Sequence, residues 1–337
     1  MTQTYSIGVD LGGTNLRIAS YSEALGLMDT ISLPTRLVEG RERVVRDLCE
    51  AVVSLKRKGY DGRALAGVGI GTPGPLELPE GILRNPPNLH GWDGFDLRNA
   101  VETCLAHSVS IESDGNAAAL AEARLGAGRE QKVDSLGILT LGTGVGNGLI
   151  LNGQIWHGST GMGGEAGHSI VKDQDGAPCG CGGFGCLEQY ASAMAIQRMA
   201  RERMGSEAPA SSHAIFLMAS EGEPRALSIF ETVGHSLAIA LTGLVNTLNL
   251  PLYLLGGGVC EAWEMFAPRM FRELRVRSYV YRLTEPGEGD PAALERHKTY
   301  ILRAQLGSGA GLLGACLLPY ERQDSTSTSQ ENLLVHK

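Results

Sequence analysis

Two distant segments of this 337-residue chain follow one plan: an apolar strand, a glycine turn that contains a threonine, and a second apolar strand. The first segment runs from Ile7 to Ile18 and the second from Ile138 to Ile150. Because glycine allows close approach, each turn can present successive backbone N–H groups to phosphate oxygens. One such turn is usually only a hairpin, but two indicate a polyphosphate chain held from both sides of a cleft. Neither turn carries the ending of a Walker A loop or a full dinucleotide fingerprint.

Length and composition narrow the class of protein. A chain of 337 residues exceeds the size at which one core stops growing, so two lobes are expected. The apolar content of 43% is ordinary for a soluble globular protein, and the sequence shows neither a secretory signal pattern nor an uncharged membrane span. The formal charge of −8 offers no general attraction to nucleic acid or to anionic lipid. We therefore expect a cytoplasmic protein with no nucleic-acid or membrane partner.

Strand and helix patterns alternate along the chain, which indicates an α/β architecture. Asn152-Gly153 is the strongest short hairpin signal. The polar segment 321–337 is expected to be a disordered tail, and 78–94 a long irregular connection. Strands are predicted over 5–11, 16–20, 65–70, 108–112, 136–141, 148–151 and 252–255, and helices over 42–58, 116–125, 187–203, 224–248 and 307–318.

Three cysteines and one histidine gather between residues 168 and 186: His168, Cys179, Cys181 and Cys186. Three thiolates and one imidazole complete a tetrahedral zinc site and leave no open coordination position for a substrate. The alternatives are a disulfide-bearing loop and a run of reduced surface cysteines with no role. An odd count of seven cysteines without a secretory pattern argues against the disulfide. Such a closed site holds its segment rigid, and Glu165 and Glu188 bracket it. Carboxylates fixed in this way suit a ligand rich in hydroxyl groups.

Asp114 lies at a predicted junction between a strand and a helix. Aspartate is favoured as a helix cap, and spacing alone does not exclude that role. The alternative is a general base that accepts a proton from a sugar hydroxyl while the hydroxyl oxygen attacks a γ-phosphoryl group.

At this point the chain resembles the ROK family of repressors, open reading frames and sugar kinases, over residues 5 to 318. The resemblance implies an α/β, two-lobed actin-like ATPase (ribonuclease H-like) fold, with each lobe a mixed sheet flanked by helices. It places a small lobe at 1–117, completed by a C-terminal helix at 303–320, and a large lobe at 118–302. The matching motifs are Asp10-x-Gly-Gly-Thr14, Asp114-Gly-Asn-Ala-Ala118, Leu141-Gly-Thr-Gly144, Gly164-Glu-x-Gly-His168 and Cys179-x-Cys-Gly-x-x-Gly-Cys186-x-Glu188.

The resemblance also implies a role for each matched residue. Asp114 would be the catalytic base toward a sugar 6-hydroxyl, and Asp10 would lie near Mg²⁺ and the phosphates of ATP. His168 would touch the sugar with one ring nitrogen and the structural Zn²⁺ with the other. The other roles fall to Gly12, Gly13 and Thr14 as the first phosphate loop, Gly142, Thr143 and Gly144 as the second, Gly256, Gly257 and Gly258 near the adenosine, and Glu165, Glu188 and Gly74 in the sugar pocket.

Two positions bear on these roles. Ser113 stands where many family members have an asparagine that touches the sugar, so Ser113 would make a shorter contact, directly or through water. Glu188 has an alternative role as a carboxylate favoured at a helix N-terminus.

The function that the sequence favours is an ATP-dependent hexokinase, with glucose as the preferred sugar because 85–92 resembles a stretch of the family's bacterial glucokinases. The alternatives are a kinase for another hexose or an N-acetylhexosamine, such as fructose, mannose or N-acetylmannosamine, and a non-catalytic sugar sensor. Asp10 lies too close to the N-terminus for a preceding helix-turn-helix domain, so the repressor branch is not expected. A homodimer is expected from the family alone.

Overall fold

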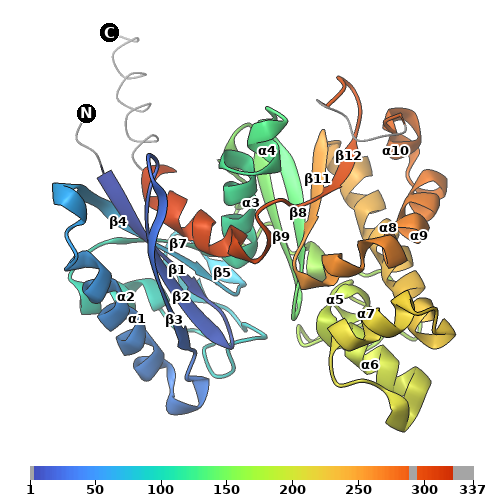
Figure 1. Cartoon of the computed structure of the whole chain (residues 1–337), viewed down its shortest axis with the longest axis horizontal. Helices are drawn as coiled ribbons and strands as arrows, with labels where there is room; N and C mark the ends of the chain where they lie inside the picture. Colours follow the sequence, from blue (N-terminus) through green and yellow to red (C-terminus); the bar gives the residue numbers. More distant parts are fainter. Residues whose placement is uncertain (1–3, 288–293, 322–337) are drawn as a thin grey trace. The chain divides into compact units, whose positions relative to one another are not determined.

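The computed structural model describes residues 4–287 and 294–321, and these residues divide into two compact units (Figure 1). The first unit comprises 4–121, 157–163 and 309–321, and the second comprises 122–156, 164–287 and 294–308. The chain therefore returns to the first unit twice, once for a short internal segment and once for the C-terminal helix. The tail expected at 321–337 lies, except for its first residue, outside the described residues.

A five-stranded mixed sheet forms the centre of the first unit, in the order β3-β2-β1-β4-β7. β1 pairs antiparallel with β2 and parallel with β4, and β4 pairs parallel with β7. The carboxyl ends of β1, β4 and β7 therefore meet at one edge of the sheet. The strands are β1 (Thr4–Leu11), β2 (Asn15–Ser22), β3 (Gly26–Pro34), β4 (Ala64–Thr72) and β7 (Val109–Ser113), and β5 (Leu76–Glu77) and β6 (Ile82–Leu83) form a separate hairpin.

The second unit repeats this plan in the order β10-β9-β8-β11-β12. β8 pairs antiparallel with β9 and parallel with β11, and β11 pairs parallel with β12. The repeat seen in the sequence thus corresponds to two sheets of identical strand order and direction. The strands are β8 (Leu136–Leu141), β9 (Val145–Leu151), β10 (Gln154–Ile155), β11 (Leu252–Gly256) and β12 (Tyr300–Arg303).

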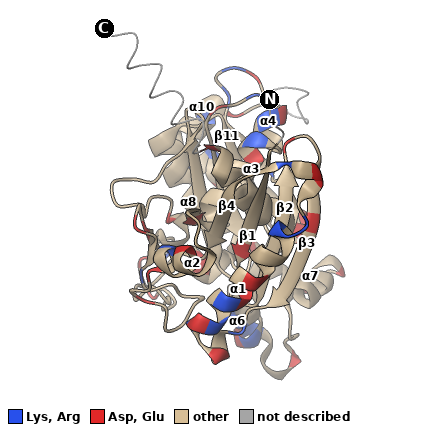
Figure 2. Ribbon diagram, turned by 90° about the vertical axis from the view of Figure 1, so that its left-hand side faces the viewer, with Lys and Arg blue, Asp and Glu red and all other residues tan. Residues whose placement is uncertain are grey.

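Helices α1 (Arg41–Lys56) and α2 (Leu97–Leu105) pack in the first unit. An apolar stripe of α1, at Val45, Leu48, Val52 and Leu55, is buried in one core with the strands, and blue and red segments mark the charged positions of the helix in Figure 2. Helix α3 (Asp114–Arg124) begins directly after β7, and a C-terminal helix begins at residue 310. Short 3₁₀ turns lie at Leu37–Glu39, Tyr60–Gly62 and Gly307–Gly309.

Helix α8 (Pro224–Leu248), which has the predicted bounds, forms the centre of the helical layer in the second unit. By length and composition alone it could cross a membrane, but 56% of its most apolar window is buried in the core, as in core helices generally. Against it pack α5 (Glu188–Ala191), α6 (Ala193–Met204), α7 (Ser212–Ser220), α9 (Trp263–Arg277) and α10 (Tyr279–Thr284). This unit also contains α4 (Ala127–Glu130) and 3₁₀ turns at Ala166–His168, Gly205–Glu207 and Gly258–Ala262.

The single helix predicted over 187–203 is wrong, because Ser192 divides it into α5 and α6. Ser192 has extended backbone angles, and its hydroxyl accepts the N–H of Ala195, which makes it the N-cap of α6. The sequence analysis also missed β3 and α2. Asp96 caps α2 by accepting the N–H of Asn99, a signal that was present in the sequence.

Two glycines in helices give a matched test of packing. A Cβ on Gly314, in the C-terminal helix, would lie 1.8 Å from the carbonyl oxygen of Ala117 in α3, whereas Gly243 in α8 has open space around it. Gly314→Ala should therefore lower the free energy of unfolding by about 1–3 kcal/mol or more, because the two helices must separate. Gly243→Ala should raise it by roughly 0.5–1 kcal/mol through helix propensity. Denaturant unfolding of both variants measures the two signs, and a stabilised Gly314→Ala variant would contradict the close packing.

Candidate functional site

The first predicted phosphate loop, Gly12 to Thr14, is the tight turn between β1 and β2. The N–H of Gly12 donates to the carbonyl of Asn15 at 3.0 Å. The hydroxyl of Thr35, the residue after β3, donates to the carbonyl of Gly12 at 2.7 Å and closes the loop. A Cβ on Gly13 would lie 3.0 Å from the carbonyl oxygen of Asn88, so the irregular segment 85–92 runs directly beside this loop. Buried Trp92 anchors that segment in the core of the first unit.

Asp10 lies at the carboxyl end of β1, one residue before the end of the strand. Its carboxylate pairs with Arg17, which faces it across the β1–β2 pairing and donates through Nε at 3.0 Å and through Nη2. The sequence analysis did not identify Arg17. The hairpin register was the signal that could have found it, because residues on either side of a tight turn face each other across the ladder.

Asp114 and Ser113 lie at the carboxyl end of β7, at the same edge of the sheet as Asp10. The hydroxyl of Ser113 accepts the N–H of Asn116 at 3.2 Å, so the residue that caps α3 is Ser113 and not Asp114. The capping role considered for Asp114 is therefore taken by its neighbour. Gly74 follows β4 in the same unit, in the connection to β5.

Burial raises the pKa of Asp114 to about 6, and the negative charge of Asp10 acts in the same direction. The backbone N–H groups of Gly115 and of Asp114 itself oppose this rise. Asp114 is nevertheless exposed, so water can reach it. A carboxyl group with these properties titrates close to neutral pH and can accept a proton there.

The second predicted phosphate loop, Gly142 to Gly144, is the turn between β8 and β9. Gly142 and Thr143 line a cavity of about 410 Å³ in the second unit, together with Gly258, Phe216 and Phe230. Aromatic side chains beside a glycine turn make this cavity suitable for an aromatic base attached to a phosphate chain.

The three glycines after β11 have different surroundings. Gly257 has a φ of 88°, and a Cβ there would lie 2.4 Å from the carbonyl oxygen of Leu141. Glycine is therefore required at this position to bring the end of β11 against the end of β8. Gly256 is buried in β11, and Gly258 is the member of the three that lines the cavity.

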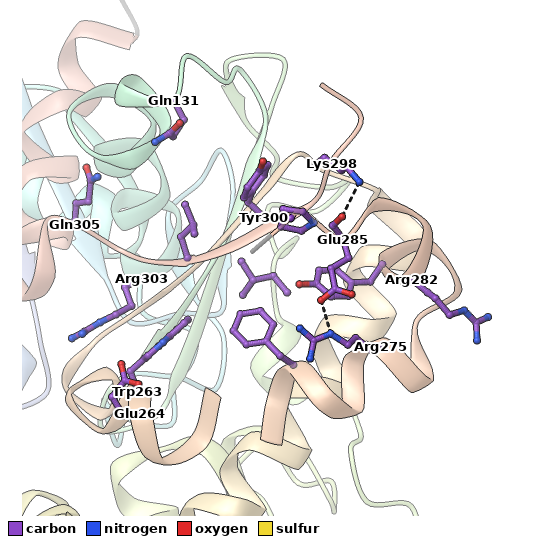
Figure 3. A pocket seen from close by; sticks show the side chains of 16 residues that line it. Gln131, Trp263, Glu264, Arg275, Arg282, Glu285, Lys298, Tyr300, Arg303 and Gln305 are labelled. Carbon is purple, nitrogen blue, oxygen red and sulfur yellow. Dashed lines mark hydrogen bonds and ion pairs between the residues drawn. The ribbon is translucent and has the colours of Figure 1, made fainter. Parts of the chain in front are cut away.

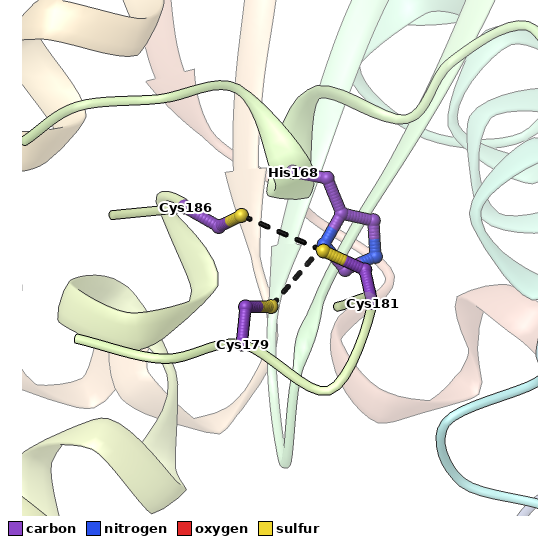
Figure 4. Close-up of side chains that lie close together, drawn as sticks. All are labelled: His168, Cys179, Cys181 and Cys186. Atoms are coloured by element: carbon purple, nitrogen blue, oxygen red, sulfur yellow. Dashed lines mark hydrogen bonds between the residues drawn. The ribbon is translucent and has the colours of Figure 1, made fainter. Parts of the chain in front are cut away.

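His168, Cys179, Cys181 and Cys186, the His/Cys cluster, come together in the second unit (Figure 4). Their ligand atoms all lie within 4.8 Å of one another, and none of the cysteines forms a disulfide. His168 directs Nδ1 toward the Cys179 sulfur at 3.6 Å, and the sulfurs of Cys181 and Cys186 are 3.7 Å apart. The disulfide alternative is therefore absent from this cluster.

These distances fit a tetrahedral zinc site. Zinc bonds of ~2.3 Å to sulfur and ~2.0–2.1 Å to nitrogen place two sulfurs ~3.8 Å apart and a sulfur and a nitrogen ~3.6 Å apart. Burial and the neighbouring thiols raise the pKa of Cys186 to about 12. Burial also opposes ionisation of Cys181, but the N–H of Gly183 and the two other thiols together lower its pKa. Three thiols this close ionise together only beside a cation.

The two predicted sugar-binding glutamates flank the His/Cys cluster. His168 presents Nε2 to the Glu165 carboxylate at 4.0 Å, on the opposite side of the ring from the cysteines. Glu188 is the first residue of α5, and its Oε2 accepts the N–H of Val145 at 3.0 Å. Glu188 thus connects the cluster with the strand that leaves the second phosphate loop, and it also occupies the helix N-terminus considered as its alternative role.

A larger cavity, of about 1170 Å³, lies elsewhere in the second unit (Figure 3). None of the residues that line it is a predicted site residue. Glu285 accepts from Arg275 at 2.5 Å and, through its backbone carbonyl, from Lys298 at 2.9 Å, while Arg282 and Arg303 point away from its centre. The arginine and lysine side chains that line this cavity are therefore either hydrogen-bonded or directed away from its centre.

Comparison with known proteins assigns the family. The ROK family model matches residues 6–322, and the chain belongs to the ROK family. It is 33% identical to a glucokinase of Thermotoga maritima over 94% of the chain and 97% of that protein. It is 32% identical to an N-acetylmannosamine kinase of Yersinia pestis, with 92% and 97% covered.

A solved structure agrees with this assignment. A ROK glucokinase from Streptomyces griseus, in complex with glucose and AMPPNP, superposes with a TM-score of 0.73 at 31% identity, covering 93% of the chain and 98% of that protein. The predicted α/β fold of the actin-like ATPase type is confirmed.

Metal content tests the His/Cys cluster. The purified protein should contain about one zinc ion per chain, and Cys181→Ser should lose it because one of four ligands is removed. Cys104→Ser, which replaces an exposed thiol outside the cluster, serves as the matched control and should retain the metal. Elemental analysis of the three proteins gives the stoichiometry. Equal zinc in the Cys181→Ser and wild-type proteins would mean that the ligand set is wrong.

Proposed function

We propose that this protein is an ATP-dependent hexokinase that phosphorylates the 6-hydroxyl of a hexose, with glucose the preferred substrate. The observation that carries the proposal is the Asp114 carboxyl, whose pKa is raised to about 6 beside the Asp10 carboxylate at one edge of a sheet. A base of this pKa is ionised at neutral pH and still basic enough to accept the proton of an attacking hydroxyl. Full-length similarity to glucokinases supports the proposal.

In this proposal the first unit supplies the base and the site for the metal-bound phosphates. Asp10, which accepts a hydrogen bond from Arg17, would offer oxygen ligands to Mg²⁺, which prefers such ligands and accompanies the phosphates of ATP. Gly12, Gly13 and Thr14 would offer backbone N–H groups to the phosphate oxygens. Mg²⁺ would neutralise charge that develops on the transferred group.

The second unit would bind the nucleotide and the sugar ring. The cavity at Gly142, Thr143 and Gly258 would take the adenosine end of ATP. Glu165, Glu188 and Nε2 of His168 would accept or donate hydrogen bonds to ring hydroxyls, and Gly74 and Ser113 of the first unit would contact the same sugar. Zinc in the His/Cys cluster would fix the His168 ring and leave Nε2 free, because Nδ1 faces the cysteines.

The identity of the sugar rests on finer contacts. Ser113 already accepts one hydrogen bond to cap α3, which leaves its own proton and one lone pair for a sugar. An N-acetylhexosamine is the second candidate, because an N-acetylmannosamine kinase is also 32% identical. A coupled assay across glucose, fructose, mannose and N-acetylmannosamine, with several phosphoryl donors, decides between them. A cytoplasmic homodimer remains the expected form of the protein.

Asp114→Asn tests the base. The change keeps the shape of the side chain but removes its ability to accept a proton, so kcat should fall by about a hundredfold to ten-thousandfold. Hexose affinity and thermal unfolding should change little. Asp96→Asn is the matched control, because Asp96 does cap a helix and should be replaceable without loss of turnover. Near-normal turnover by Asp114→Asn would remove Asp114 from catalysis.

The pH dependence of kcat/KM for the hexose gives a second test. The base works only when ionised, and burial and Asp10 raise the pKa of Asp114 to about 6, so kcat/KM should fall as the pH drops through this value. Raising the free Mg²⁺ concentration should move the fall to lower pH, because a cation at Asp10 offsets its charge. A profile that falls only near pH 4, the ordinary range for aspartate, at low Mg²⁺ would contradict the assignment.

A further inference from the structure

Residues 157–163 form a short segment that belongs to the first unit, although the chain on both sides of it belongs to the second. The segment follows β10 and ends two residues before Glu165. It is rich in glycine, with Gly158, Gly161 and Gly163, and Gly164 follows it. Glycine-rich chain has many accessible conformations, so specific contacts are needed to hold it in one of them.

Three contacts hold the segment in place. The N–H of Gly163 donates to the carbonyl of His157 at 2.8 Å, which closes the segment into a loop. Gly161 has a φ of 85°, and a Cβ on it would lie 2.5 Å from the backbone nitrogen of Leu78, so the loop rests on the β5–β6 hairpin. The side chain of His157 makes the third contact, through Nε2 to Glu112.

Glu112 connects this loop with the proposed base. It is the residue before Ser113 in β7, and its side chain is 9% exposed. One carboxylate oxygen contacts His157, and the other accepts the side-chain amide of Asn116 at 3.1 Å. Asn116 lies in the first turn of α3, where its N–H donates to the cap residue Ser113. One buried carboxylate thus joins the loop before Glu165 to the turn that carries Asp114.

We propose that His157 is a positioning residue for hexose binding: its contact with Glu112 fixes the glycine-rich loop that leads into Glu165 relative to the turn that carries Asp114. This inference rests on the proposed function of Glu165 and Asp114. It explains why a half-exposed histidine, 39% accessible, is paired with a buried carboxylate. The hydrogen bond to Glu112 also raises the pKa of His157, which favours the charged form of the pair.

The physical effect of the contact is preorganisation. If the loop is free before the sugar arrives, ordering it opposes binding, and the apparent affinity for the hexose falls. The nucleotide cavity shares no residue with the loop, so ATP affinity should be indifferent to the contact. A loss of hexose affinity without a loss of ATP affinity therefore distinguishes a positioning role from a general loss of stability.

His157→Ala and His157→Gln provide the test. His157→Ala removes the contact and should raise the KM and the Kd for the hexose about tenfold, since a hydrogen bond to a charged group is lost. His157→Gln places an amide N–H within reach of Glu112 and should recover most of this loss. The KM for ATP should stay within twofold of the wild-type value in both variants. Coupled kinetics and calorimetric titration with the hexose in the absence of ATP measure these quantities.

His235→Ala is the matched control. His235 is 37% exposed and faces Glu273 at 3.6 Å, so it resembles the His157 pair in chemistry and exposure but lies on α8. Its removal should leave both KM values unchanged. Glu112→Ala, which also removes the acceptor for Asn116, should weaken hexose binding at least as much as His157→Ala does. Adding His157→Ala to it should cause little further loss, because the contact is already broken.

The possible outcomes distinguish a failure of the proposed function from a failure of the positioning role. A wild-type protein that neither binds nor phosphorylates a hexose overturns the proposed function and this inference together. A wild-type hexokinase whose His157→Ala variant keeps the hexose KM, raises both KM values equally, or is not improved by the glutamine overturns the positioning role alone. Selective weakening of hexose binding with recovery in His157→Gln supports it.

Discussion

Three carboxylates lie at one edge of the first sheet, and the way each one is balanced determines the chemistry of this unit. Asp10 is paired with Arg17, and Glu112 is paired with His157. Among the described residues, Asp114 forms no ion pair, so burial and the nearby charge of Asp10 raise its pKa to about 6. The parallel pairing of β1, β4 and β7 brings these groups together, because it directs three strand ends to the same edge. Asp10 and Glu112 thus each contact a basic side chain, whereas Asp114 has no such partner among the described residues.

The His/Cys cluster lies in a loop with little regular structure, which needs support of another kind. Between the 3₁₀ turn at Ala166–His168 and α5 the chain forms isolated bridges, such as that between Ile170 and Cys186, in place of a sheet. Four ligand atoms within 4.8 Å give this loop a fixed centre once a cation balances the thiolates. The flanking carboxylates of Glu165 and Glu188 then project from a rigid support. Binding of hydroxyl groups, the role proposed for these two carboxylates, needs such support, because each hydrogen bond is directional and individually weak.

The sequence predicted what depends on local pattern and missed what depends on register. Helix α8 was predicted with its observed bounds because its apolar residues recur over seven turns, and the cluster was predicted because cysteine spacing is specific. The break at Ser192 was missed because one hydroxyl that caps a helix does not disturb the apolar period. Arg17 and His157 were missed for another reason: their partners lie across a sheet or far along the chain, at positions that only the paired strands define. The roles of Asp114, Glu165 and Glu188 remain predictions, although the structure shows what each one contacts.

The two repeated sheets differ in the residue pair that lies just before the glycine turn. In the first, Asp10 faces Arg17 just before the glycine turn, whereas the corresponding pair in the second is Thr140 and Gly146. The first turn therefore lies beside an ion pair whose carboxylate can hold a cation, and the second is neutral and opens into an aromatic cavity. A nucleotide such as ATP needs both environments, because its charged phosphate chain must be neutralised while its base must be desolvated. The two turns also differ in length, because residues 12–15 lie between the last paired residues of the first hairpin and residues 142–144 between those of the second. Charge and length together therefore make the two turns suited to different parts of a nucleotide.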